Sequence, residues 1–265
     1  MLLTISLLLL ASAPEAATPP PSTQEAIAII WGGGKDAASA QESLRRWEEE
    51  KKLLGGALTF AEGYPKRVSS ASVPGLNPGF EIVLLGYCGR DEATSARHFL
   101  KALHPFAYEK PVKVEALACP RWAGEKQDVV VEPPKTVKGK GVTLTVAVAS
   151  LKGPVDPGIG EKLTTSWVRV VARDSKNKLL DVVAMEDTEE GTGMSTVGCE
   201  TQVTVRKSAV VLERGCTRPS GAACNRNPGE RTRSTVRWDG DLQRLDTDEK
   251  TLEEWTVDYS KDCAE

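Results

Sequence analysis

Apolar and polar positions follow two different rhythms along the chain, and the change falls near residue 128. Before it, short apolar runs alternate with segments in which apolar residues recur every three or four positions, the spacing of an amphipathic helix. After it, helical spacing disappears and β-branched runs follow one another between turn-forming residues. The pattern predicts an α+β N-terminal half and an all-β C-terminal half.

The N-terminal half predicts elements in the order β-α-β-β-α-β. Asp36 is the expected N-cap of the first helix, and the glycines Gly55 and Gly56 are expected to end it. This order forms an antiparallel four-stranded sheet with both helices on one face, a ferredoxin-like arrangement whose other face is open. The predicted strands cover 26–30, 58–61, 80–88 and 107–114, and the predicted helices cover 36–54 and 91–103.

The C-terminal half predicts a β-sandwich or a small barrel, because short strands recur at close spacing. We place the two domains at 26–122 and 128–265, with Pro133, Pro134 and a Gly/Lys-rich stretch marking a linker or a long connecting turn. The expected strands are 141–149, 167–174, 178–187, 201–207, 209–215, 232–240 and 253–259.

One glycine-rich stretch raises the question of a phosphate site. The sequence WGGGKDAAS resembles the Ser-Gly-Gly-x-Asp-Ser loop of the PP-loop ATP pyrophosphatases. Gly32 and Ala37 stand where that loop has its two serines, so both hydroxyl groups that would donate to phosphate are absent. The stretch therefore favours a strand-to-helix corner in which glycines permit a positive φ.

The N-terminus predicts export. Residues 1–17 carry an apolar run followed by small residues, typical of a secretory signal peptide, and the run is too short to span a bilayer. Residues 18–25 then form a polar, proline-rich linker. We expect a secreted or periplasmic protein with no stable membrane anchor after signal cleavage.

An even number of cysteines agrees with export, because six cysteines in such a protein predict three disulfides. No spacing is C-x-x-C, so zinc and thioredoxin-like chemistry are not indicated. Cys88 and Cys119 are expected to pair because both lie in the N-terminal half. The other predicted pairs are Cys216–Cys224 and Cys199–Cys263.

The sequence predicts no catalytic residue, cofactor or metal ligand. Its only two histidines, His98 and His104, lie on or at the end of the second predicted helix and are expected to be surface or capping residues. Lys and Arg gather in residues 206–237, and Asp and Glu gather in residues 239–265. With a net charge of −3, we expect basic strands to face acidic ones across hairpins, and no nucleic-acid partner.

Residues 80–103 carry a family resemblance. A strand ending in Gly86-Tyr87 precedes a helix with Ala93, Ala96, Leu100 and Leu103 on one stripe, and this is similar to the second half of a SPOR domain. The resemblance implies peptidoglycan binding on the open face of the sheet, without catalysis. In place of the family's Val-Gly-x-Phe feature, the first strand offers Trp31-Gly32-Gly33.

Two aromatic residues are the candidate ligand contacts. Strand alternation puts Trp31 on one face with Ile27 and Ile29, and puts Tyr87 on one face with Glu81, Val83 and Leu85. Exposed, these rings would stack on sugars; the alternative is packing in the core.

The first functional hypothesis is therefore an exported, non-catalytic binding protein of a bacterial envelope, whose partner is a cell-wall glycan or an envelope protein. The alternative is a secreted inhibitor or protein-interaction module. It would act through a loop closed by a Cys216–Cys224 disulfide, because a preorganised loop binds at low entropic cost.

Overall fold

The computed structural model describes residues 22–123, 128–139, 141–155, 162–188, 191–192, 195–196, 198–217 and 226–258. The predicted signal peptide and most of the predicted linker lie outside the described residues, as do Cys224 and Cys263.

The N-terminal half contains a four-stranded antiparallel sheet, here called the first sheet, in the order β3-β4-β1-β5. Two helices accompany it: α1 (Ala37–Glu50), continued by the 3₁₀ turn η1 (Lys51–Leu54), and α2 (Arg90–Leu103). The strands are β1 (Gln24–Gly34), β3 (Lys66–Ser69), β4 (Glu81–Cys88) and β5 (Tyr108–Val114).

One strand of this sheet differs from the sequence prediction. The segment expected at 58–61 forms only the short β2 (Leu58–Thr59), which pairs with β6 (Arg121–Trp122) outside the first sheet. Leu58 is buried in a core below the helices, together with Leu53 and Leu54, and this burial draws the segment away from β4. The polar β3 takes the edge position instead.

The glycine stretch belongs to a strand and does not form the predicted strand-to-helix corner, since β1 continues through Gly34 and pairs with β4 there. A Cβ at Gly32 would lie 2.9 Å from Ser43 Oγ of α1, so the absence of side chains lets this helix pack directly on the strand. The turn itself is Lys35-Asp36. The Asp36 carboxylate accepts a 2.7 Å hydrogen bond from the Ser39 N–H, which confirms the predicted N-cap.

Every described element from Asp128 onward is a strand, as the sequence predicted, and the strands form two larger antiparallel sheets. The middle sheet has the order β11-β10-β9-β7, with β8 also paired to β9. It comprises β7 (Asp128–Val131), β8 (Lys135–Lys138), β9 (Val142–Val155), β10 (Lys162–Asp174) and β11 (Leu179–Thr188). The predicted linker around Pro133-Pro134 thus contributes β7 and β8 to this sheet.

The distal sheet has the order β14-β15-β16-β17. Its strands are β14 (Gly198–Arg206), β15 (Ala209–Thr217), β16 (Arg226–Asp239) and β17 (Arg244–Asp258). The short strands β12 (Gly191–Thr192) and β13 (Ser195–Thr196) pair with each other. Middle and distal sheets pack face to face around Val146, Val170, Leu212 and Val236.

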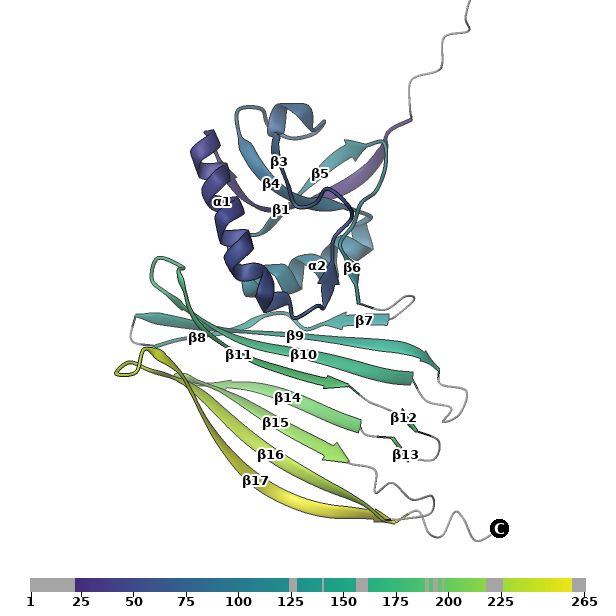
Figure 1. The fold of residues 1–265 in the computed structure, drawn as a ribbon, viewed down its shortest axis with the longest axis vertical. Coiled ribbons are helices and arrows are strands. Elements are labelled where there is room, and N and C mark those ends of the chain that lie inside the picture. Colours follow the sequence, from purple (N-terminus) through teal and green to yellow (C-terminus); the bar gives the residue numbers. More distant parts are fainter. Residues whose placement is uncertain are drawn as a thin grey trace, which may run out of the picture.

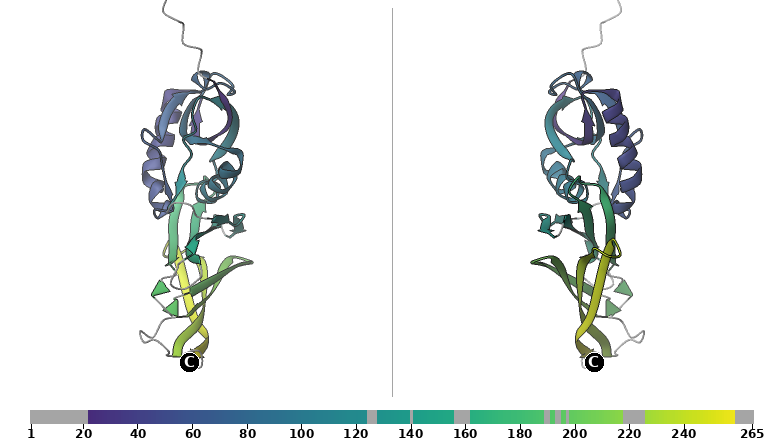
Figure 2. Two further views of the ribbon diagram at one scale, coloured as in Figure 1. Left: turned by 90° about the vertical axis from the view of Figure 1, so that its right-hand side faces the viewer. Right: turned by 90° about the vertical axis from the view of Figure 1, so that its left-hand side faces the viewer.

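The layers stack along the long axis of the molecule, from the first sheet through the helices and the middle sheet to the distal sheet (Figures 1 and 2). Strand β10 contributes side chains to the hydrophobic cores on both faces of the middle sheet. Its Val168 and Val170 face the distal sheet, whereas Trp167 and Val171 belong to a core shared with the helices and the first sheet. The change in secondary structure near residue 128 is therefore not a break in the hydrophobic core.

The face of the first sheet opposite the helices is not open, contrary to the expectation from sequence. Residues 70–76, which follow the edge strand β3, cross it, and Val73 and Leu76 pack with Ile30 and Val112. The Lys113 N–H donates a 2.9 Å hydrogen bond to the Pro74 carbonyl, which ties this covering segment to β5. The sequence did not predict the cover because the segment is a Ser/Pro/Gly-rich loop with few apolar residues.

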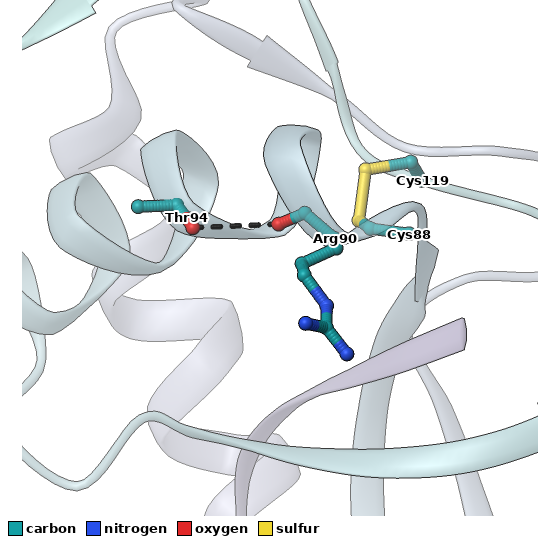
Figure 3. Close-up of a disulfide and its surroundings, with 4 residues drawn as sticks. All are labelled: Cys88, Arg90, Thr94 and Cys119. Atoms are coloured by element: carbon teal, nitrogen blue, oxygen red, sulfur yellow. Dashed lines mark hydrogen bonds between the residues drawn. A yellow bond between two sulfur atoms is a disulfide. The ribbon is translucent and has the colours of Figure 1, made fainter. Parts of the chain in front are cut away.

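Two disulfides join cysteines within the described ranges. Cys88 is bonded to Cys119, as predicted, beside the start of α2 (Figure 3). Cys199 is bonded to Cys216, so the predicted Cys216–Cys224 and Cys199–Cys263 pairs are wrong. The reason is strand register, because Cys199 and Cys216 lie directly opposite each other in the β14–β15 hairpin with Cα atoms 4.2 Å apart.

Peptide mapping under non-reducing conditions tests this connectivity. We expect a proteolytic fragment in which Cys199 is linked to Cys216, and a second in which Cys88 is linked to Cys119, both disappearing on reduction. A fragment linking Cys216 to Cys224 would contradict the register of the β14–β15 hairpin.

Candidate functional site

The predicted ligand contact Trp31 lies in the core and cannot serve as an exposed sugar platform. Its side chain is 1% exposed, on the same helix-covered face as Ile29, as alternation predicted. The indole stacks on the His104 imidazole with centroids 3.9 Å apart and planes 14° from parallel. It also meets Trp47 edge-on at 5.1 Å.

Tyr87 lies on the opposite face of the first sheet from Trp31. The pairing of β1 with β4 shifts register between Ile29 and Ile30, and this bulge reverses the alternation, so Tyr87 joins Leu84 rather than Leu85. Its ring meets Tyr64 edge-on at 6.3 Å, and partial burial raises the pKa of its phenol. The structure therefore does not bring the two predicted aromatics together.

A buried polar cluster lies where the helices meet the middle sheet: Glu50 at the end of α1, His104 at the end of α2, and Arg173 on β10. The three are 6%, 3% and 3% exposed. His104 Nδ1 lies 3.1 Å from Glu50 Oε2, and Arg173 contacts both carboxylate oxygens, at 3.1 and 2.5 Å. His104 is a capping residue, as predicted, but its ring is interior rather than at the surface.

Two arginines of β10 also cap the C-terminal ends of the helical segments by hydrogen bonding to their carbonyl groups. Arg173 donates to the Leu103 carbonyl at the end of α2. Arg169 donates a 3.0 Å hydrogen bond to the Leu53 carbonyl in η1 and pairs with Glu186 of β11. Terminal helix carbonyls lack intrahelical donors, so these guanidinium groups satisfy them while facing the negative end of the helix dipole.

The surroundings of Glu50 and His104 shift the pKa values of both side chains. Burial opposes ionisation of Glu50, but hydrogen bonds from His104 and Arg173 outweigh it, and the pKa of this carboxyl is lowered. Burial also lowers the pKa of His104, against the opposing effect of Glu50. A neutral imidazole beside a carboxylate already held by an arginine stabilises the layer junction.

The strongest candidate for ligand contact lies at the other end of the molecule, around Trp255 on β17. Trp255 is partly exposed and stands opposite Gly229 of β16. A Cβ at Gly229 would overlap the indole, and one at Gly215 would lie 3.6 Å from Cη2, so the ring lies against the glycine backbone of two strands. Because these glycines have no side chains, the indole ring can pack directly against the backbone.

An open groove of about 490 Å³ adjoins this ring, here called the Trp255 groove. The Arg231 guanidinium carbon lies 5.9 Å from the centroid of the indole, and Arg231 is held 3.0 Å from the Glu253 carboxylate. The groove combines one aromatic surface with polar groups able to accept or donate hydrogen bonds. It is lined by Pro228, Gly229, Glu230, Glu254, Trp255 and Thr256.

The basic and acidic segments of the sequence lie next to each other in the distal sheet. Arg231 pairs with Glu253 at 3.0 Å, and Arg237 stands opposite Asp246 in the β16–β17 register. This arrangement confirms the predicted pairing of basic with acidic strands.

The Trp255 groove could not be predicted from sequence, because the segment EEWTVDY gives no clear buried face. The available signal was a pair of glycines near predicted strands, since Gly215 ends the predicted strand 209–215 and Gly229 precedes the predicted strand 232–240. Strand register was needed to show that this group is Trp255.

Comparison with known proteins gives no match, whether to a protein-family model, a curated protein or a solved structure. Within the described ranges, no helix is both long and apolar enough to cross a membrane. The same residues contain no group of three or more His, Cys, Asp or Glu side chains placed to hold a metal ion.

The Glu50 cluster predicts acid sensitivity. Because the pKa of His104 is lower in the folded protein than its ordinary value of 6.5, unfolding takes up a proton, and stability falls as pH drops below about 6.5. The lowered pKa of Glu50 adds a further loss as pH falls below about 4.5.

Thermal melting between pH 7.5 and 5.5 measures the histidine contribution. We expect the fall in Tm to be smaller in His104→Gln than in the wild type by about 2–4 °C, the shift that about 1 kcal/mol produces in a chain of this size. His98→Gln is the matched control, because it removes the only other histidine and is expected to keep the wild-type slope. Equal slopes in wild type and His104→Gln would contradict the assignment.

Proposed function

We propose that this chain is an exported, non-catalytic binding protein of a bacterial envelope, and that it binds a cell-wall glycan at the Trp255 groove. The observation that carries the proposal is the position of Trp255, with one side of its ring against the backbone of Gly229 and the other part open to the groove. A ring held in this way loses no rotamer freedom when it binds.

The chemistry of the groove suits a sugar. An aromatic ring has a negative face, which attracts the C–H groups on the flat side of a pyranose. Arg231 can donate hydrogen bonds to sugar hydroxyls, and the exposed Glu254 carboxylate can accept them. Such a mixture of one apolar surface and a few polar groups is typical of small-molecule sites.

We further propose that the first sheet and its helices form a ferredoxin-like unit, with the SPOR-like character that residues 80–103 suggest. Support comes from the antiparallel order β3-β4-β1-β5, with α1 between β1 and β3 and α2 between β4 and β5. The sheet face that a SPOR domain would offer to a glycan is crossed here by residues 70–76, so we assign glycan contact to the distal sheet.

Export and the lack of catalysis have separate support. The disulfides Cys88–Cys119 and Cys199–Cys216 are typical of oxidising compartments outside the cytoplasm. The titratable groups of the Glu50 cluster make their hydrogen bonds to one another and to the protein, which suits a structural role. The alternative of an inhibitory loop closed by Cys216–Cys224 is withdrawn, since Cys216 is bonded to Cys199.

Co-sedimentation with purified, insoluble peptidoglycan tests the proposal. We expect the wild type in the pellet and an apparent affinity about tenfold lower for Trp255→Ala, equivalent to a loss of about 1.4 kcal/mol. Gly229→Ala keeps the indole but displaces it from the backbone of residue 229, so the retention of this variant should also fall.

Leu252→Ala is the matched control, because Leu252 is an exposed apolar residue of the same strand that does not line the groove. It should sediment as the wild type does. Failure of the wild type to sediment would exclude peptidoglycan as the ligand. Equal retention of wild type and a folded Trp255→Ala would exclude the Trp255 groove as the site.

A further inference from the structure

A second groove lies at the opposite end of the molecule, between β1, β5 and the start of α2. It is open, with a volume of about 600 Å³. The apolar side chains that line it at the surface are Ile27, Pro74 and Pro111, and the covering segment also contributes Gly75. We call this the Arg90 groove, after the cation at its rim.

The wall of this groove is fixed by a close backbone approach. Gly75 has φ +104°, and a Cβ there would lie 3.0 Å from both the Pro111 carbonyl oxygen and Val112 Cα. The Lys113 N–H to Pro74 carbonyl bond closes the same contact. The groove is therefore shaped before any ligand arrives.

The adjoining disulfide anchors the backbone close to Arg90. Cys88 ends β4 opposite Ile27 of β1, and its bond to Cys119 anchors the chain two residues before Arg90. Figure 3 shows the Arg90 side chain extending away from α2 toward β1. No ion pair of Arg90 or Lys113 occurs among the side chains that the structure describes, and both are exposed.

The charge of the groove selects the class of ligand. Arg90 and Lys113 are positive, and Glu25 stands opposite Lys113 in the β1–β5 register, so the three charges sum to +1. A single carboxylate matches this charge better than a doubly charged phosphate does. The apolar lining suits small aliphatic groups next to that carboxylate.

The edge of β5 constrains how a ligand can be held. Pro111 has no N–H to donate, and the Lys113 N–H is already bonded to Pro74. A peptide cannot extend the sheet along this part of the edge, so it must be recognised by side chains.

We propose that the Arg90 groove binds an apolar peptide that ends in a free carboxylate, with Arg90 and Lys113 pairing with the carboxylate and Ile27, Pro74 and Pro111 contacting the aliphatic side chains. This site is independent of the proposed glycan site, and the two would let one molecule bridge two ligands.

Fluorescence polarisation with a labelled tetra-alanine peptide tests the proposal, with the same peptide as a C-terminal amide for comparison. We expect the acid to bind at least tenfold more tightly than the amide. Arg90→Gln and Lys113→Gln should each weaken binding of the acid about fivefold or more. Lys110→Gln is the matched control, since Lys110 is an exposed cation on β5 outside the groove, and it should bind as the wild type does.

Equal affinity for acid and amide would overturn the proposal, as would unchanged binding in the Arg90→Gln, Lys113→Gln double variant. Displacement of the peptide by inorganic phosphate at equal concentration would also overturn it, by showing a general attraction of anions. Trp255→Ala should bind the peptide normally, so failure of the glycan proposal and failure of this one give different results.

Discussion

The structure depends on two arginines of β10 that donate hydrogen bonds to the carbonyl groups at the C-terminal ends of the helical segments. Arg173 joins the Leu103 carbonyl to the Glu50 carboxylate, and Arg169 reaches the Leu53 carbonyl. Burying a guanidinium is costly unless its donors are satisfied, and here carbonyl and carboxylate oxygens satisfy most of them. Removal of one partner from a buried ion pair typically costs about 3–5 kcal/mol, so this junction strongly favours one arrangement of the layers.

That junction makes the two halves of the chain one body. The helices are packed between the first sheet and the middle sheet, and the middle sheet shares a second core with the distal sheet. The Arg90 groove and the Trp255 groove therefore lie at opposite ends of a continuous stack of layers. The two proposed binding sites are thus held at a fixed separation.

Local sequence patterns predicted the elements well where burial has a regular period. Both helices, the Asp36 cap, the long strands after Asp128 and the Cys88–Cys119 pair were predicted correctly. Errors arose where tertiary contacts decide. A bulge at Leu85 in β4 moved Tyr87 to the other face, and strand register paired Cys199 with Cys216. The Trp255 groove needed the pairing of β16 with β17, which no local pattern reveals.

Because the β10 arginines join the helices to the middle sheet, we expect these layers to unfold together. Native-state hydrogen exchange measures this directly by comparing the opening free energies of amides in α2, such as Leu100, with those in β10, such as Val170. We predict equal opening free energies that match global unfolding. Exchange of α2 through a lower-energy opening while β10 stays protected would contradict the account.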